Sequence, residues 1–231
     1  MLRQTDLAPL LLYEFYPDNT EIRPMEGFYG ADHYRLSLIL TRVQRDSLQP
    51  NVFHVQGKTR YKQAVEDVTG DITVAQLADY YNQDILASRA VDSLGNAPAA
   101  RAYSTLLNVS LRSRQQPIRR LQGVGGLDFY IDELGKMEAV SSPDGITADP
   151  DAPGKGAGLL IRGEWLNGPA ALNGPFVLSR NVFISADDLF NDFGVGDRGS
   201  EINPKYARLG WDKYWENDEW WAEAQKPALS I

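Results

Sequence analysis

The stretch that decides the fold class is Tyr34-Arg35-Leu36-Ser37-Leu38-Ile39-Leu40-Thr41, in which the even positions are apolar and the odd positions are mostly polar. Such alternation is typical of a strand with one buried and one wet face, and strands of this kind favour antiparallel pairing. The same alternation recurs in three other segments, 58–62, 101–112 and 127–132. The chain is therefore predicted to be β-rich.

One segment has helical rather than strand periodicity. Thr73 and Gln76 have the spacing of a capping box, in which each side chain satisfies a backbone N–H of the other. Apolar residues follow at helical spacing, namely Val74, Leu77, Ala78, Tyr81, Ile85 and Leu86. Gly95 and Pro98 come next and favour an end to the helix. The spacing predicts a helix over 74–90, and Ser185 is expected to cap a second, short one.

Together these patterns predict an α+β, β-rich fold: an antiparallel sheet or sandwich of roughly seven or more strands with one main packed helix and an extended C-terminal aromatic segment. Turn signals at 132–136 predict a hairpin with Gly135 at positive φ, and Asn167-Gly168-Pro169 and its near copy at 173–175 predict tight turns at a sheet edge. Asn203-Pro204 predicts a helix start, which Gly210 would close.

Composition divides the chain into four parts. We expect a β-rich core over 1–141 that contains the helix, a Pro/Gly/Asp-rich loop over 142–158 and a continuation of the core over 159–198. The last part, 199–231, is expected to be a C-terminal arm with a Trp-rich helix. A loop as long as 142–158 is uncommon inside a compact domain, and it is a candidate for a domain boundary or for a loop that orders against a partner.

Charge is distributed unevenly along the chain, whose net charge is −8. Residues 33–62 hold 6 basic and 1 acidic side chains, 101–122 hold 5 and 0, and 185–231 hold 5 and 10. The basic segments can be solvated faces of strands. Alternatively, they can pair with the acidic C-terminus of the same copy or of a neighbouring copy. The acidic balance makes nucleic acid an unlikely partner.

The sequence offers little for catalysis. It has no Cys and no Gly-x-Ser-x-Gly motif, and its two His are His33 and His54. The 31 Asp and Glu residues are too many for the sequence to indicate which two could form the acid pair of a glycoside hydrolase. The acids near 187–192 and 144–151 lack the spacing of a metal site, and the Gly-rich turns lack a phosphate-binding motif. We predict no catalytic residue, no metal ligand and no cofactor. No apolar run is long enough to span a membrane, and the start lacks a signal-peptide pattern.

The most informative feature is an aromatic cluster near the C-terminus. Its members are predicted to bind a partner: Trp211, Tyr214, Trp215, Trp220 and Trp221. An aromatic stripe at this spacing can pack on its own chain, anchor a protein interface or stack on sugar rings. The leading hypothesis is a non-enzymatic structural or assembly subunit, made in the cytoplasm and belonging to a virus or phage particle. It would bind other protein subunits, of the same or a different chain, through the C-terminal arm and the long loop. The alternative is a carbohydrate-binding or carbohydrate-cleaving protein with exposed Trp residues.

Overall fold

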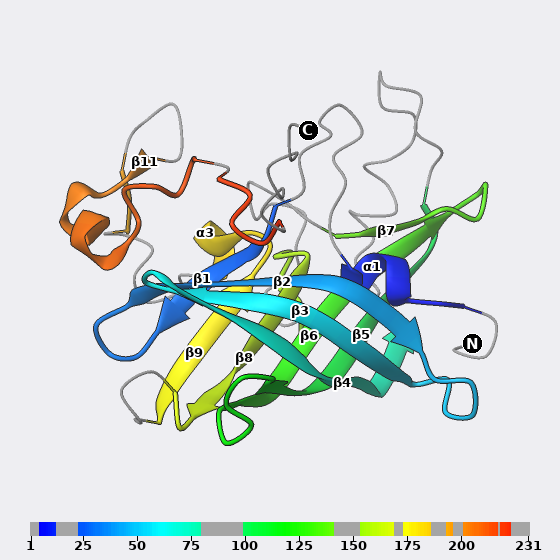
Figure 1. Ribbon diagram of the computed structural model, residues 1–231. Helices are drawn as coiled ribbons and strands as arrows, with labels where there is room; N and C mark the ends of the chain where they lie inside the picture. The colour runs from blue at the N-terminus through cyan, green and yellow to red at the C-terminus, as the bar shows by residue number, and fades with distance from the viewer. Residues whose placement is uncertain are drawn as a thin grey trace, which may run out of the picture.

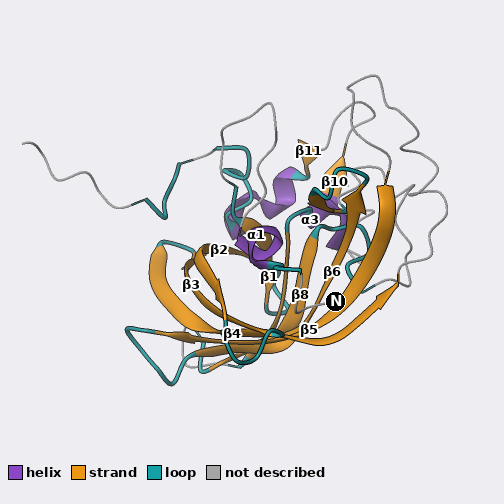
Figure 2. Cartoon of the chain, turned by 90° about the vertical axis from the view of Figure 1, so that its right-hand side faces the viewer, coloured by secondary structure: helices purple, strands orange, loops and turns teal. Residues whose placement is uncertain are grey.

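The computed structural model describes residues 5–12, 23–79, 99–140, 153–168, 173–185, 193–195, 201–216 and 218–222. Eight strands form a closed antiparallel β-barrel (Figures 1 and 2). They are β1 (Met25–Tyr29), β2 (Tyr34–Arg45), β3 (Val52–Tyr61), β4 (Ala64–Asp79), β5 (Ala99–Ser113), β6 (Arg120–Asp132), β8 (Leu159–Leu166) and β9 (Gly174–Ser179). Each pairs with the next, and β9 returns to pair with β1. A short strand, β7 (Met137–Ala139), extends the pairing of β6.

The predicted strands are confirmed, whereas the predicted α+β fold class is wrong. The chain closes into a barrel in place of an open sheet or sandwich, and the described helices are short: α1 (Ala8–Leu12), α3 (Val182–Ser185) and the 3-10 helix η3 (Pro204–Leu209). None of these helices in the described part of the chain has the length and apolar character needed to cross a membrane.

The predicted helix over 74–90 is wrong over its first six residues, which form the end of β4. A β-bulge between Val74 and Gln76 inserts an extra residue opposite β5. As a result Val74 and Leu77 both reach the barrel core although they are three positions apart. The bulge thus produces an apolar spacing that resembles a helix. Residues 80–90 lie outside the described part of the chain.

Apolar side chains fill the barrel from every strand. Alternate residues of β2, Leu36, Leu38 and Leu40, point inward, and Leu10 and Leu11 of α1 join the same core with Leu7, which precedes α1. At the C-terminal end of β1, Tyr29 packs edge-on against Trp165 and Tyr61. The inward positions of an eight-stranded barrel can be filled by side chains in this way.

Close approach of strand backbones demands glycine inside the barrel. Gly123 of β6 lies opposite Gly163 of β8. A Cβ at either position would meet a carbonyl oxygen of the opposite strand at 2.0 Å. Two facing glycines therefore let β6 and β8 coil tightly enough for the ring of strands to close.

A second core covers the outer face of β1. Phe28 points out of the barrel and packs with Val182 of α3 and with three residues from the C-terminal part of the chain, Phe193, Tyr206 and Trp211. We call residues 201–222 the C-terminal segment. It begins with β11 (Glu201–Ile202), which pairs with β10 (Gly194–Val195), and it lies beside β1 and β2 (Figure 1).

Several predicted turns are confirmed. Gly135 has φ 83° in the β6–β7 turn, and the side chain of Asn203 caps η3, which ends at Gly210 with φ 90°. Asn167 has φ 48° where β8 ends, and its N–H donates to the Asn173 side chain. The second turn, predicted at 173–175, is wrong, because Gly174 and Pro175 are the first residues of β9 and pair with β8. Because β8 and β9 pair inside the closed ring, this connection is not at a sheet edge.

The two helices predicted near the C-terminus have different outcomes. Ser185 is the last described residue of α3, where its hydroxyl donates to the Val182 carbonyl and accepts from the Ser179 hydroxyl; residues 186–190, over which the short helix was predicted, lie outside the described residues. Residues 211–215 form turns, not a Trp-rich helix, since the left-handed Gly210 ends η3 just before them. Of the predicted loop, 142–152 lie outside the described residues, whereas Gly154 packs on the buried Asp128.

Candidate functional site

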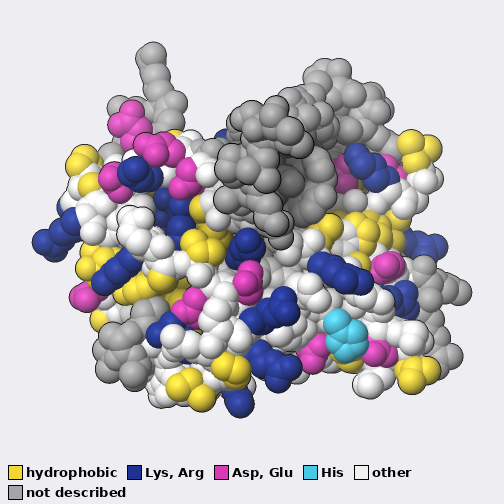
Figure 3. Space-filling view, viewed as in Figure 1, with side chains coloured by type: hydrophobic (Ala, Val, Ile, Leu, Met, Phe, Trp, Pro, Cys, Tyr) yellow, Lys and Arg dark blue, Asp and Glu magenta, His cyan; other side chains and the backbone are white. Residues whose placement is uncertain are grey.

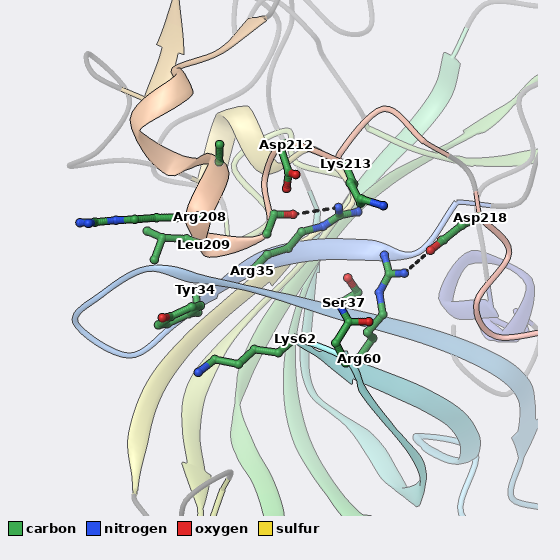
Figure 4. Close-up of a pocket in the computed structure, with 13 residues that line it drawn as sticks. Tyr34, Arg35, Ser37, Arg60, Lys62, Arg208, Leu209, Asp212, Lys213 and Asp218 are labelled. Carbon is green, nitrogen blue, oxygen red and sulfur yellow. Dashed lines mark hydrogen bonds and ion pairs between the residues drawn. The ribbon is translucent and has the colours of Figure 1, made fainter.

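A cleft opens between the outer face of β2 and β3 and the C-terminal segment (Figure 4). It has a volume of about 440 Å³, within the range of small-ligand and peptide pockets. Five cationic side chains and two carboxylates line it: Arg35, Arg60, Lys62, Arg208 and Lys213, with Asp212 and Asp218. We call this cleft the basic groove. In Figure 3, Lys and Arg side chains lie across this face of the molecule, with Asp and Glu side chains between them.

The floor of the basic groove is a buried ion pair. Arg35 of β2 lies on the outer face beside Glu26 of β1, and its Nε and Nη2 donate to the two carboxylate oxygens at 2.9 and 2.7 Å. Its Nη1 donates to the Gly210 carbonyl at 3.2 Å, and Ser37 donates to Glu26 at 2.7 Å. Arg35 is therefore a structural group that ties the C-terminal segment to the barrel, since all of its charge is already matched.

One wall of the groove holds a second ion pair. Arg60 of β3 donates from Nη1 to the Asp218 carboxylate, and its guanidinium lies 5.0 Å from the centre of the Trp220 ring. Arg60 thereby fixes a carboxylate and an aromatic ring of the C-terminal segment in one place. The indole Nε1 of Trp220 is buried and has no partner among the described residues.

Two cations of the groove remain without a carboxylate. No acid in the described part of the chain pairs with Lys62 or Arg208. Lys62 stands in the β3–β4 turn at φ 56°, and its Nζ lies 4.2 Å from the centre of the Tyr34 ring. Arg208 extends from the last turn of η3, and Figure 4 shows it and Lys62 reaching toward the same side, one on each side of Tyr34.

The five aromatic residues predicted to bind a partner have unequal surroundings. Trp211 is 1% exposed in the second core, and its Nε1 donates to the His33 carbonyl. Tyr214 is half-buried, with Trp211 and Trp215 as ring neighbours. Trp215 is 55% exposed and stacks on Phe183 at an interplanar angle of 22°. Trp220 and Trp221 are half-buried and pack edge-on against each other.

His33 and His54 do not come together in one site. The ring of His33 lies edge-on to Phe28 in the second core. The ring of His54 bridges two carboxylates, with Nε2 at 2.9 Å from Asp46 and Nδ1 at 2.7 Å from Asp71. Within the described ranges, no group of three or more acidic or His residues is arranged to hold a metal ion.

The His54 bridge makes stability depend on pH. Its hydrogen bonds, first to Asp46 and then to Asp71, raise the pKa of His54 above 6.5. The pKa of Asp46 is lowered, first by the Gln49 N–H and then by His54. A raised histidine pKa stabilises the fold below 6.5, and the effect is lost as pH rises through the folded-state pKa. We expect His54→Gln to lower the free energy of unfolding at about pH 5.5 but not at about pH 9. Urea denaturation at both pH values measures this; an equal loss at both would contradict it.

The sequence patterns did not predict this groove as a site, although the excess of basic residues over 33–62 indicated part of its lining. The local sequence could not show that Arg208 of η3 and Lys62 of the β3–β4 turn line the same cleft. The cations that line the groove can hold anionic groups. In the comparisons, no family model, no curated protein and no solved structure matches this chain.

Proposed function

We propose that this chain is a non-enzymatic assembly subunit that binds neighbouring subunits, copies of itself included, through its C-terminal segment. The observation that carries the proposal is the contrast between Trp211 and Trp215. Trp211 is buried and anchors the segment to the outer face of β1, whereas Trp215 is held by Phe183 with more than half of its surface exposed. A large aromatic residue on a rigid support is typical of the centre of a protein interface.

The proposed setting is a virus or phage particle, reached after synthesis in the cytoplasm. A chain without Cys suits such a particle, because neither its folding nor its stability depends on the redox state of its surroundings. The proposed neighbours are protein subunits, and the filled barrel supports this choice, since its interior holds side chains of the chain itself.

Self-association tests the proposal. We expect the full-length protein to form oligomers that grow with concentration, and Trp215→Ala to reduce the association constant about tenfold or more, as loss of an interface centre does. Light scattering of both proteins over a wide range of concentration measures this. Leu134→Ala is the control, because Leu134 is 85% exposed on the β6–β7 turn, away from the C-terminal segment. A wild-type protein that stays monomeric throughout would contradict the proposal.

A carbohydrate-binding role is the second candidate, and the exposed Trp215 ring favours it, because aromatic rings of this kind can stack on sugars. The two candidates predict different results for the wild type and for Trp215→Ala. Under the second, a polysaccharide shifts the Trp fluorescence of the wild type but not of Trp215→Ala, and the protein remains a monomer.

A further inference from the structure

The basic groove has one wall that its own chain occupies and one wall that it leaves open. On the occupied wall, Asp218 pairs with Arg60 and Trp220 packs on the same guanidinium. On the open wall, Lys62 and Arg208 are exposed and flank Tyr34. From this asymmetry we infer that the open wall binds an acidic peptide segment of a neighbouring subunit, which presents two or more carboxylates to Lys62 and Arg208.

The occupied wall indicates the chemistry of the expected ligand. The segment that already lies on the basic face of β2 and β3 is an acidic peptide, with Asp212 and Asp218 lining the groove and Glu216 beside them. Its contacts combine a carboxylate on an arginine with an aromatic ring over the same cation. On the open wall, Lys62 and Arg208 offer two cations to the carboxylates of a second peptide, and Tyr34 already packs against Lys62.

The exposure of the two cations favours a ligand with several charges. A single ion pair between exposed side chains contributes little, so one isolated anion would be held weakly. A peptide that reaches both cations gains from the second contact without a second loss of translational freedom. The positive lining also contrasts with the net charge of −8, so it concentrates acidic segments at this place on the molecule.

The carboxylates of the groove argue against nucleic acid as the ligand. Asp212 and Asp218 line the same cleft as the cations. A continuous polyanion with a phosphate at every nucleotide would meet both acids, whereas a peptide can place its carboxylates at the open wall alone. Charge complementarity therefore favours a protein segment.

The test uses the full-length protein and a labelled Asp/Glu-rich peptide, with fluorescence anisotropy as the readout. We expect the peptide to bind, its Asn/Gln counterpart not to bind, and binding to weaken with salt. Lys62→Gln with Arg208→Gln should raise the dissociation constant about tenfold, because two ion pairs are lost. The matched control is Arg112→Gln with Arg120→Gln, an exposed pair facing each other on β5 and β6, and it should bind as the wild type does.

Four results would overturn the inference: no binding of the peptide, equal binding by the groove variant and the wild type, stronger binding of a single-stranded oligonucleotide than of the peptide, or displacement of the peptide by inorganic phosphate at a concentration near the dissociation constant of the peptide. The inference rests on the proposed assembly role, but the two can fail separately. Oligomers that depend on Trp215 but show no peptide binding leave the assembly role standing and remove the acidic ligand. A monomer that binds the peptide removes self-assembly and leaves the groove.

Discussion

Replacing Trp211 by alanine should lower the free energy of unfolding by about 3–5 kcal/mol, the range for large aromatic residues removed from a core. Trp211 is 1% exposed and has ring contacts with Phe28 and Phe193 at 4.8 Å between centres. The variant also leaves the His33 carbonyl without the indole donor. The loss should be large because the Trp211 side chain packs the C-terminal segment against the barrel.

Chemical denaturation followed by circular dichroism measures this loss. Trp215→Ala provides the control, since a half-exposed Trp of the same segment should cost about 1 kcal/mol or less. If Trp211→Ala and Trp215→Ala had similar stabilities, the second core would contribute little to the fold.

Arg35→Met should lower the free energy of unfolding by a similar amount, about 3–5 kcal/mol, because it leaves the buried Glu26 carboxylate without its counter-charge. Both side chains of the pair are 8% exposed, so water cannot replace the lost partner easily. The variant also removes the hydrogen bond to the Gly210 carbonyl, which ties down the C-terminal segment.

A second substitution separates the charge from the packing. Glu26→Gln combined with Arg35→Met removes both charges and keeps an acceptor for the Ser37 hydroxyl. We expect this double variant to recover most of the stability, to within about 1–2 kcal/mol of the wild type, as seen when a buried ion pair is replaced as a whole. A double variant as unstable as Arg35→Met would show that packing, and not the isolated charge, causes the loss.

Local patterns in the sequence predicted the strands well, because alternation reports which side of a strand is buried. The closure of the barrel was not predictable in the same way, since it depends on β9 returning to β1. Over 74–79, the described part of the helix predicted over 74–90, the prediction failed for an identifiable reason. At the bulge after Val74, the side-chain alternation shifts by one position, and the apolar spacing then matches a helix.

The candidate site was predictable only in part. The basic excess of 33–62 and the acidic C-terminus were evident, and the structure brings them together in the Arg60–Asp218 pair of one chain. The roles of Trp211 and Trp215 could not be distinguished, because both are Trp residues of one short acidic stretch. Tertiary packing against Phe28 and Phe193 buries the first, and nothing in the local sequence reports those contacts.

The pairing of β1 with β9 has a consequence for how the barrel forms. Most neighbouring strands are joined by hairpins and can pair early, but Glu26 must find Ser179 across most of the chain before the ring is complete. Closing so long a loop is entropically costly, and folds rich in such contacts reach the native state in milliseconds to seconds. The second core joins Phe28 of β1 to Val182, which follows β9, so we expect the C-terminal segment to dock fully after this pairing. This expected order of folding would place the proposed partner-binding surface at the final step.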